Sequence, residues 1–298
     1  MALEGILEDL LDRLKPFTAQ LFPRLVLLEI RDSGLRGQVL RDDDQPGPLG
    51  LQAPLPPLTC RDGMPLEKDS LADLVGDLLL SEKQLEAYVL AVLPFEACHW
   101  RVLVRPFPDP PEDPIEALRL LDPPLNLPFS LAEAFLDLHP LPGQPDEMLL
   151  VAAPRRLVDG WIDVFRLAGV KLERLAPAQG CLLAALEEPL RSCEETDLMA
   201  VLVPEENDCL LWLFHRGIPV FERALPLGGP DLIEELRRCL AFYHRQEPAL
   251  RRLRLLLAGP LGDREELEAA LGVEAEELEI APFGSLLLRG LAIREGRR

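Results

Sequence analysis

Residues 198–248 read LMAVLVPEENDCLLWLFHRGIPVFERALPLGGPDLIEELRRCLAFYHRQEP, and the order of elements in this stretch decides the fold. Three short apolar runs, separated by turn residues, occupy 199–203, 209–214 and 218–225. Runs of this length divided by Pro, Gly, Asn and Asp are typical of consecutive antiparallel strands. A glycine pair and then apolar residues every three or four positions predict a helix that ends before Pro248.

The first third of the chain repeats this order less clearly. Strands are predicted at 24–30, 35–40 and 87–93, with a helix between the last two. Asp69 or Ser70 is expected to cap that helix. Two such segments predict an α/β protein with an actin-like fold, in which two ribonuclease-H-like lobes each contain a mixed sheet flanked by helices.

Three domains are predicted from this pattern. An N-terminal amphipathic helix covers 1–22, a first lobe covers 23–190 and a second lobe covers 191–298. The first lobe includes an inserted subdomain at roughly 95–176, and the acidic stretch 187–197 links the lobes. The N-terminal helix has a leucine stripe opposite an acidic face, so we expect it to pack on protein rather than to enter a membrane.

Several local elements are also predicted. An exposed loop is expected at 42–57, and a short helix at 131–138 with Ser130 as its cap. A helix that begins at Arg155 ends at Gly169, and a late strand is expected at 278–281. These elements complete the two lobes.

The composition limits the possible functions. The 298 residues include 51 acidic and 31 basic side chains, which gives a net charge of −20, and 48% are hydrophobic. Such acidity argues against binding to nucleic acid or to an anionic membrane surface, because both need clustered Lys and Arg. The chain also lacks an apolar run of roughly 20 residues and a basic N-terminal region. We therefore expect a globular cytoplasmic protein.

Cysteine and histidine positions predict neither a metal site nor nucleophilic catalysis. Six cysteines are scattered without metal-ligand spacing, at Cys60, Cys98, Cys181, Cys193, Cys209 and Cys239. The four histidines, His99, His139, His215 and His244, have no Ser or Cys partner at a recognised spacing. We expect free thiols in a reducing compartment and no catalytic residues.

Four segments together resemble the PilM family of type IV pilus assembly proteins, which is related to FtsA. The segments, in chain order, are LPFSLAEAFLDL at 127–138, LVAAPR at 150–155 with AGV at 168–170, LPLGG at 225–229 with LAFY at 240–243, and PF at 282–283 with RGLAIR at 289–294. The resemblance implies a cytoplasmic scaffold, peripheral to the inner membrane through its partner. That partner would be the cytoplasmic tail of a PilN-like inner-membrane protein, bound near Phe129, Leu131 and Phe135. A GspL-like type II secretion component has the same fold but would need a transmembrane segment.

The nucleotide loops that this resemblance implies are degenerate. Actin-like proteins hold phosphates and Mg²⁺ with two hairpin loops that each contain Asp followed by Gly. The first loop here has Glu29, then Arg31 in place of the glycine, and Ser33. The second has Pro204 in place of the Asp and Glu206 in place of the glycine. We therefore expect no cofactor, with ATP and Mg²⁺ disfavoured.

Alternatives remain for these residues. Glu29, Glu205 and Glu206 could form an acidic Mg²⁺ site, or they could lie on solvent-facing turns. Arg31 could pair with a phosphate or with Glu206. Gly228 and Gly229 could contact a ribose or allow close helix packing, and Gly259 and Gly262 remain from the adenosine-side loop. The competing functional hypothesis is an active ATPase or a sugar-kinase-like phosphotransferase.

Overall fold

The computed structural model describes residues 24–40, 50–104, 112–120, 125, 127–206, 208–262 and 264–296. The predicted helix at 1–22 and most of the predicted loop at 42–57 lie outside these residues. Contacts group the described chain into two compact units, which we describe separately. Unit 1 contains residues 24–97, 156–176 and Gly296, and unit 2 contains 98–155 and 177–295. The lobe boundaries inferred from the sequence follow a different division and stay a prediction.

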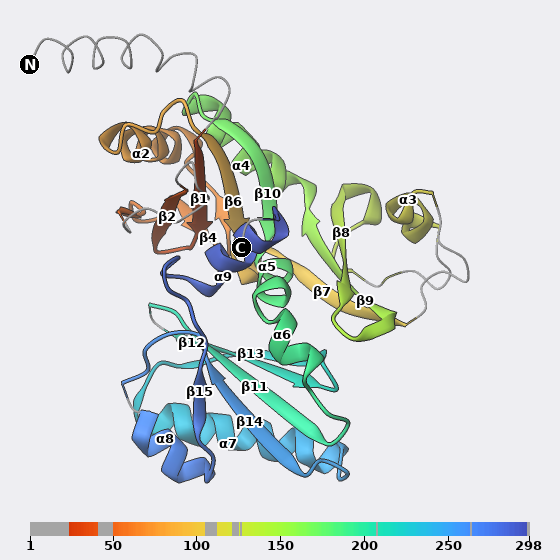
Figure 1. Ribbon diagram of the computed structural model, residues 1–298. Coiled ribbons are helices and arrows are strands. Elements are labelled where there is room, and N and C mark those ends of the chain that lie inside the picture. The colour runs from red at the N-terminus through yellow and green to blue at the C-terminus, as the bar shows by residue number, and fades with distance from the viewer. Residues whose placement is uncertain are drawn as a thin grey trace, which may run out of the picture. The chain divides into compact units, whose positions relative to one another are not determined.

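Unit 1 is built on a five-stranded mixed sheet (Figure 1). Its strands are β1 (Leu25–Ile30), β2 (Gly34–Leu40), β3 (Leu51–Pro54), β6 (Tyr88–Leu93) and β10 (Lys171–Pro177), in the order β10-β6-β1-β2-β3. β1 pairs antiparallel with β2 and parallel with β6. Residues 26–30 of β1 are buried, as expected of the central strand.

Two helices and a small hairpin accompany this sheet. They are α2 (Lys68–Ser81), α4 (Arg155–Leu167) and the strands β4 (Cys60–Arg61) and β5 (Met64–Pro65). Each helix buries an apolar stripe, which includes Leu71 and Val75 in α2 and Trp161 and Phe165 in α4. The predicted cap of α2 is wrong. The cap is Glu67, two or three residues before the predicted Asp69 or Ser70, and it forms no side-chain cap bond, so Asp69 lies in the first turn of the helix.

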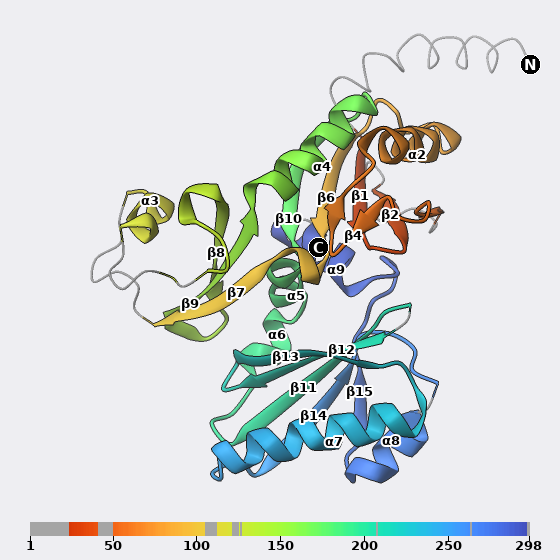
Figure 2. The same ribbon diagram turned by 180° about the vertical axis from the view of Figure 1, so that it is seen from behind.

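Unit 2 contains the second five-stranded sheet, with α7 and α8 along one face (Figure 2). Its elements are β11 (Asp197–Pro204), β12 (Asp208–His215), β13 (Ile218–Pro226), α7 (Gly229–Gln246), β14 (Arg252–Leu257), α8 (Arg264–Leu271) and β15 (Ala275–Glu277). β11, β12 and β13 are consecutive and antiparallel, which confirms the prediction from residues 199–225. The strand predicted at 278–281 is wrong, because β15 ends at Glu277 and Ile280 accepts a turn hydrogen bond from Gly284 N.

The two sheets have the same topology. If the five strands of each sheet are numbered in sequence order, both sheets have the spatial order 5-4-1-2-3. This is β10-β6-β1-β2-β3 in unit 1 and β15-β14-β11-β12-β13 in unit 2. In both cases the first strand pairs antiparallel with the second and parallel with the fourth. The internal repeat predicted from the order of elements is therefore present in the backbone.

Unit 2 also contains a three-stranded antiparallel sheet. It consists of β7 (His99–Val104), β8 (Ala134–Leu141) and β9 (Gln144–Pro154), in the order β7-β9-β8, with the short helices η1 (Phe95–Ala97), α3 (Pro114–Arg119) and η2 (Leu131–Glu133) nearby in the chain. The predicted helix at 131–138 is wrong. Ser130 caps only the single turn η2, and residues 134–141 pair with the long apolar strand β9. The apolar spacing suits either structure, and this pairing decides between them.

Three helices complete unit 2: α5 (Ala178–Ala185), α6 (Glu187–Arg191) and α9 (Leu286–Arg294). The predicted linker at 187–197 thus begins with a helix. α5 and α9 approach so closely that a Cβ added at Gly290 would lie 1.8 Å from the carbonyl oxygen of Cys181. No helix in the part of the chain that the structure describes is long and apolar enough to cross a membrane.

Candidate functional site

The first candidate loop is the β1–β2 turn, and an ion pair closes it. Arg31 and Gly34 exchange backbone hydrogen bonds of 2.9 and 3.3 Å across the turn. Glu29, near the end of β1, is only 1% exposed. The Arg31 guanidinium reaches back to it, with Nε 2.6 Å and Nη2 2.5 Å from Oε1. Arg31 thus has a local partner that the sequence analysis does not consider, and Glu29 is a buried carboxylate rather than a solvent-facing one.

Hydrogen bonds anchor the same turn to a second turn of unit 1, at residues 61–63. The sequence did not indicate this contact. The Asp32 carboxylate accepts hydrogen bonds from the backbone N–H groups of Asp62 and Gly63, at 2.7 and 2.8 Å. Trp161 Nε1 donates to the Gly63 carbonyl oxygen at 2.8 Å, so α4 holds this second turn. Ser33 takes part through its backbone, because its carbonyl accepts from Leu55 N. These contacts fix the loop without any ligand.

Cys60 lies beside this anchor and is not an activated thiol. Its Sγ is 3.4 Å from an Asp32 carboxylate oxygen. Burial raises the pKa of Cys60 to about 12, and the nearby Asp32 charge adds to the shift. A thiol with such a pKa is protonated at neutral pH and is a poor nucleophile.

The second candidate loop, the β11–β12 turn of unit 2, is open. Pro204 ends β11 and has no N–H to donate to a phosphate, and Glu205 N donates to the Asp208 carbonyl at 2.9 Å. Glu206 is exposed. Burial, and then the charges of Asp208 and Glu205, raise the pKa of the neighbouring Cys209 to about 12. The turn therefore presents the Glu206 carboxylate to solvent, at the place where the resemblance expects the glycine of a phosphate-binding loop.

Of the four candidate glycines, Gly228 caps α7, Gly229 is its first residue, and Gly259 and Gly262 lie on the loop after β14. Gly228, Gly229 and Gly259 have φ values of 76°, 67° and 147°, in the region that favours glycine. A Cβ added at Gly229 or Gly262 would meet no heavy atom of the described residues within 4 Å. Close packing therefore does not explain Gly229, whereas its backbone conformation does. A Cβ at Gly259 would lie 3.9 Å from the Pro204 ring, so the second hairpin and the β14 loop are neighbours.

The residues predicted to bind a partner have three different environments. Phe129 is half-buried, with its ring centroid 5.4 Å from that of His99. Leu131 packs against the small cluster of Leu118, Leu125 and Leu150. Phe135 is 37% exposed, and the Arg155 guanidinium lies 4.5 Å above its ring. Phe135 is thus available at the surface, while Leu131 mainly supports the subdomain.

A partly buried charge cluster joins β8 to α9 within unit 2. The Asp137 carboxylate is 3.2 Å from His139 Nε2 and 3.2 Å from Arg294 Nη2. Burial raises the pKa of Asp137, but the hydrogen bond and charge of His139, followed by Arg294, outweigh it and lower that pKa to about 2. Among the residues that the structure describes, no group of three or more His, Cys, Asp or Glu could hold a metal ion.

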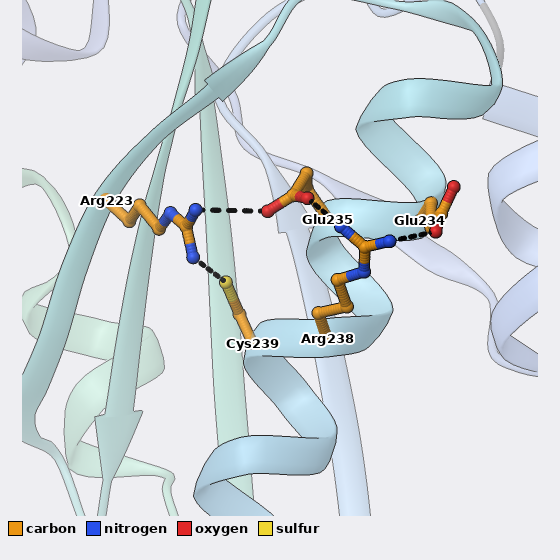
Figure 3. Close-up of polar contacts among 5 residues, drawn as sticks. All are labelled: Arg223, Glu234, Glu235, Arg238 and Cys239. Carbon is orange, nitrogen blue, oxygen red and sulfur yellow. Dashed lines mark hydrogen bonds and ion pairs between the residues drawn. The ribbon is translucent and has the colours of Figure 1, made fainter.

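Figure 3 shows a second charged group, which connects the edge strand β13 to α7. Arg223 on β13 lies 3.1 Å from Glu235 and 3.8 Å from Cys239 Sγ. Arg238 bridges Glu234 and Glu235 along the helix. Burial raises the pKa of Cys239 although Arg223 opposes the shift. This arrangement stabilises the attachment of α7 and does not activate the thiol.

Comparison with known proteins identifies the fold. No protein-family model and no curated protein matches the chain. A solved PilM–PilN type IV pilus biogenesis complex matches with a TM-score of 0.68 and 24% identity, over 91% of this chain and 98% of that chain. A Bacteroides thetaiotaomicron protein with an actin-like ATPase fold and unknown function matches with a TM-score of 0.56 and 10% identity, over 91% and 96%. This chain has the actin-like ATPase fold.

A third match extends the comparison to secretion systems. The cytoplasmic domain of EpsL, an inner membrane component of the type II secretion system of Vibrio cholerae, has a TM-score of 0.53 and 13% identity, over 91% of this chain and 95% of that chain. The predicted fold class is therefore confirmed, and the fold is similar to that of the PilM–PilN structure over nearly the whole of both chains.

Proposed function

We propose that this chain is a scaffold protein of a type IV pilus or related secretion assembly, which holds a partner and does not catalyse a reaction. The observation that carries the proposal is the PilM-like architecture over 91% of this chain and 98% of the matched one. The matched structure is a complex of PilM with PilN, and the EpsL match is to the cytoplasmic domain of an inner membrane component. The first comparison supports a role in pilus biogenesis, and the second supports a place beside the inner membrane.

The proposed partner is the cytoplasmic tail of a PilN-like inner-membrane protein, which would hold this chain at the cytoplasmic side of the membrane. The proposed docking surface is on the β7-β9-β8 subdomain, around Phe129 and the exposed ring of Phe135. A short tail binds through apolar anchors and backbone hydrogen bonds. Basic residues on the tail would suit a chain with a net charge of −20.

Capture from the native host tests this role. The full chain with an affinity tag would be expressed in that host, cross-linked and purified from detergent-solubilised membranes, and its partners identified by mass spectrometry. We expect an inner-membrane pilus assembly protein with a short cytoplasmic tail. Recovery of the chain without any inner-membrane protein would contradict the proposal.

Two substitutions test the docking surface once the captured tail is available as a peptide. Phe135→Ala and Phe129→Ala should each weaken peptide binding by about tenfold, as is usual for a central aromatic anchor. Leu58→Ala, at a residue of unit 1 that is 86% exposed, is the matched control. If folded Phe135→Ala and Phe129→Ala proteins bind like the control by titration calorimetry, the docking surface lies elsewhere.

We further propose that the degenerate loops do not bind ATP and Mg²⁺ at physiological strength. Arg31 already neutralises the buried Glu29, Pro204 cannot donate an N–H, and Glu206 adds negative charge. Each such defect costs on the order of 1–3 kcal/mol, so two or three lower affinity by roughly two to six powers of ten.

Titration calorimetry with ATP and Mg²⁺ tests the nucleotide proposal. We expect no binding below the millimolar range. The variant that combines Pro204→Asp with Glu206→Gly restores the family pattern in the second loop and should bind ATP more tightly than the natural chain. A dissociation constant of about 10 µM or tighter for the natural chain would instead favour the active ATPase or phosphotransferase hypothesis.

A further inference from the structure

An apolar groove lies at the end of the unit 2 sheet where β11 and β14 begin and α7 ends. It encloses about 320 Å³. Its floor is formed by four leucines, Leu198, Leu240, Leu250 and Leu253, two of which are nearly fully buried. The candidate nucleotide loops follow the opposite ends of the same parallel strands. The groove is therefore separate from the site described above, and its lining favours aliphatic side chains.

The rim of this groove is positively charged. Arg251 and Arg252 line it and are both exposed, together with His244. Arg251 Nη1 contacts only the backbone carbonyls of Pro248 and Leu250, at 3.1 and 3.4 Å. Neither arginine forms an ion pair with a carboxylate of the described residues. The rim thus combines available guanidinium groups with an apolar floor.

Other arginines of unit 2 are differently placed. Arg223, Arg238, Arg254 and Arg264 all pair with glutamates. Figure 3 shows two of these pairs at α7, the helix whose last turn borders the groove. Arg251 and Arg252 have no such partner among the described residues, and they are the arginines that line the groove. The groove therefore suits a segment that carries both leucines and carboxylates.

The chain contains such a segment at its N-terminus. Residues 3–14 read LEGILEDLLDRL, with leucines and isoleucine at helical spacing and carboxylates at Glu4, Glu8, Asp9 and Asp12. These residues lie outside the part that the structure describes. We propose that residues 3–14 of a second copy dock as an amphipathic helix in the groove, with leucines on its floor and carboxylates against Arg251 and Arg252. This inference does not rest on the proposed pilus function.

Charge sets the expected strength of this association. Two copies with net charge −20 repel each other, but salt screens charges beyond about 8 Å at physiological ionic strength. Contacts between the acidic segment and the arginine rim act over shorter distances and are screened less. We expect weak self-association, visible between about 1 and 100 µM, as is common for small interfaces.

Analytical ultracentrifugation of the full chain tests the contact. The mean mass should rise above 33.3 kDa with concentration. The double variant Arg251→Glu with Arg252→Glu should weaken association at least tenfold, because it reverses the charge of the rim. The control variant, Arg24→Glu with Arg156→Glu, makes the same change in net charge at exposed arginines of unit 1. Its association constant should stay within about twofold of that of the natural chain.

A mixing experiment separates this contact from any other. The variant Leu7→Asp with Leu11→Asp has a defective segment and an intact groove, while the Arg251→Glu/Arg252→Glu variant has the reverse. Each should stay monomeric alone, and an equimolar mixture should form a one-to-one dimer through a single restored contact. Three results would overturn the proposal: the natural chain is monomeric at about 100 µM, either variant associates as strongly as the natural chain, or the mixture stays monomeric.

Discussion

The β1–β2 turn of unit 1 and the β11–β12 turn of unit 2 occupy equivalent places in two sheets of identical topology, yet their surroundings differ. In the first, the carboxylate of Glu29 is buried and paired with Arg31, and Asp32 anchors the turn to Asp62 and Gly63. In the second, Glu206 is exposed and Pro204 replaces a hydrogen-bond donor. The first turn is therefore a structural element, whereas we expect the second to tolerate substitutions with little loss of stability.

Under the proposal that these loops do not bind ATP, one backbone plan is kept while its ligand chemistry is lost in two ways. In unit 1 an internal cation takes over the charge compensation of a buried carboxylate. In unit 2 Pro204 offers no backbone N–H, and Glu206 adds an exposed negative charge. The free energy of unfolding should therefore be sensitive to charge changes in the first turn and almost insensitive to them in the second.

Removal of Arg31 should have the largest effect. Arg31→Met takes the guanidinium away from a carboxylate whose side chain is 2% exposed, and breaking a buried pair on one side costs about 3 kcal/mol. Urea unfolding followed by circular dichroism measures the loss, and hydrogen exchange of β1 peptides assigns it to unit 1.

The double variant Glu29→Leu with Arg31→Met is the control, because it removes both charges. It should recover most of the stability that Arg31→Met loses. If the single and double variants were equally unstable, the ion pair would not be the reason for the sensitivity of the first turn.

Crowding at the anchor of the first turn should have the next largest effect. Gly63 has φ of 71°, and a Cβ added there would lie 2.6 Å from Ala97 Cβ and 2.8 Å from Pro94 Cγ. Gly63→Ala should cost about 2 kcal/mol or more, through backbone strain and overpacking together.

Gly229→Ala in unit 2 is a matched control for Gly63→Ala. Its φ of 67° is similar, but the added Cβ would meet no heavy atom of the described residues within 4 Å. Only the strain of the backbone conformation remains, so about 1 kcal/mol is expected. Equal losses at the two glycines in denaturant unfolding would remove the argument for a tightly anchored first turn.

Substitution of Asp137 should have a smaller effect on the free energy of unfolding, and this effect should depend on pH. The charge-sensitive site of unit 2 is thus on β8 and not at the β11–β12 turn. Its pKa of about 2 lies below the unfolded value of about 3.9. The stabilisation is therefore complete above about pH 5 and is lost as pH falls through about 2. Because the side chain is 42% exposed, we expect only about 1 kcal/mol.

The natural chain and Asp137→Asn should thus differ in unfolding free energy at pH 7 and converge as pH approaches 2. Denaturant midpoints measured at several pH values follow this difference directly. A difference that stays constant from pH 7 to pH 3 would show that the carboxylate does not titrate as its contacts with His139 and Arg294 require.

The smallest effect is expected at the second turn itself. Glu206→Ala changes an exposed residue with no ion pair to any residue that the structure describes, and should alter stability by no more than about 0.5 kcal/mol. Thermal unfolding is sufficient to measure this. A loss of 2 kcal/mol or more would mean that the second turn is as constrained as the first.

The sequence predicted the features that depend on local pattern. Alternation and turn residues located β11, β12 and β13, because nothing else fits runs of five to eight apolar residues between Pro and Gly. The Glu29–Arg31 pair could also have been predicted, since residues two apart in an extended chain share a face. The resemblance instead points to a phosphate or Glu206 as the partner of Arg31.

The features that the sequence did not predict depend on distant partners. Residues 131–138 were assigned to a helix, and only the pairing of β8 with β9 makes most of them a strand. Asp32 accepts hydrogen bonds from Asp62 and Gly63, which lie about 30 residues later in the chain. Gly63 in turn accepts one from Trp161, which is 98 residues away. Periodicity contains no information about such contacts.

The close approach of α5 and α9 has a consequence for synthesis of the chain on the ribosome. The last strand of the unit 1 sheet, β10, is complete when Pro177 has been synthesised. Helix α9, which packs against Cys181 of α5, is complete only at Arg294, 117 residues later. At 5–20 residues per second this delay is roughly 6–23 s. During that interval the surface of α5 that packs against Gly290 is uncovered, so we expect nascent unit 2 to need protection by chaperones for longer than unit 1.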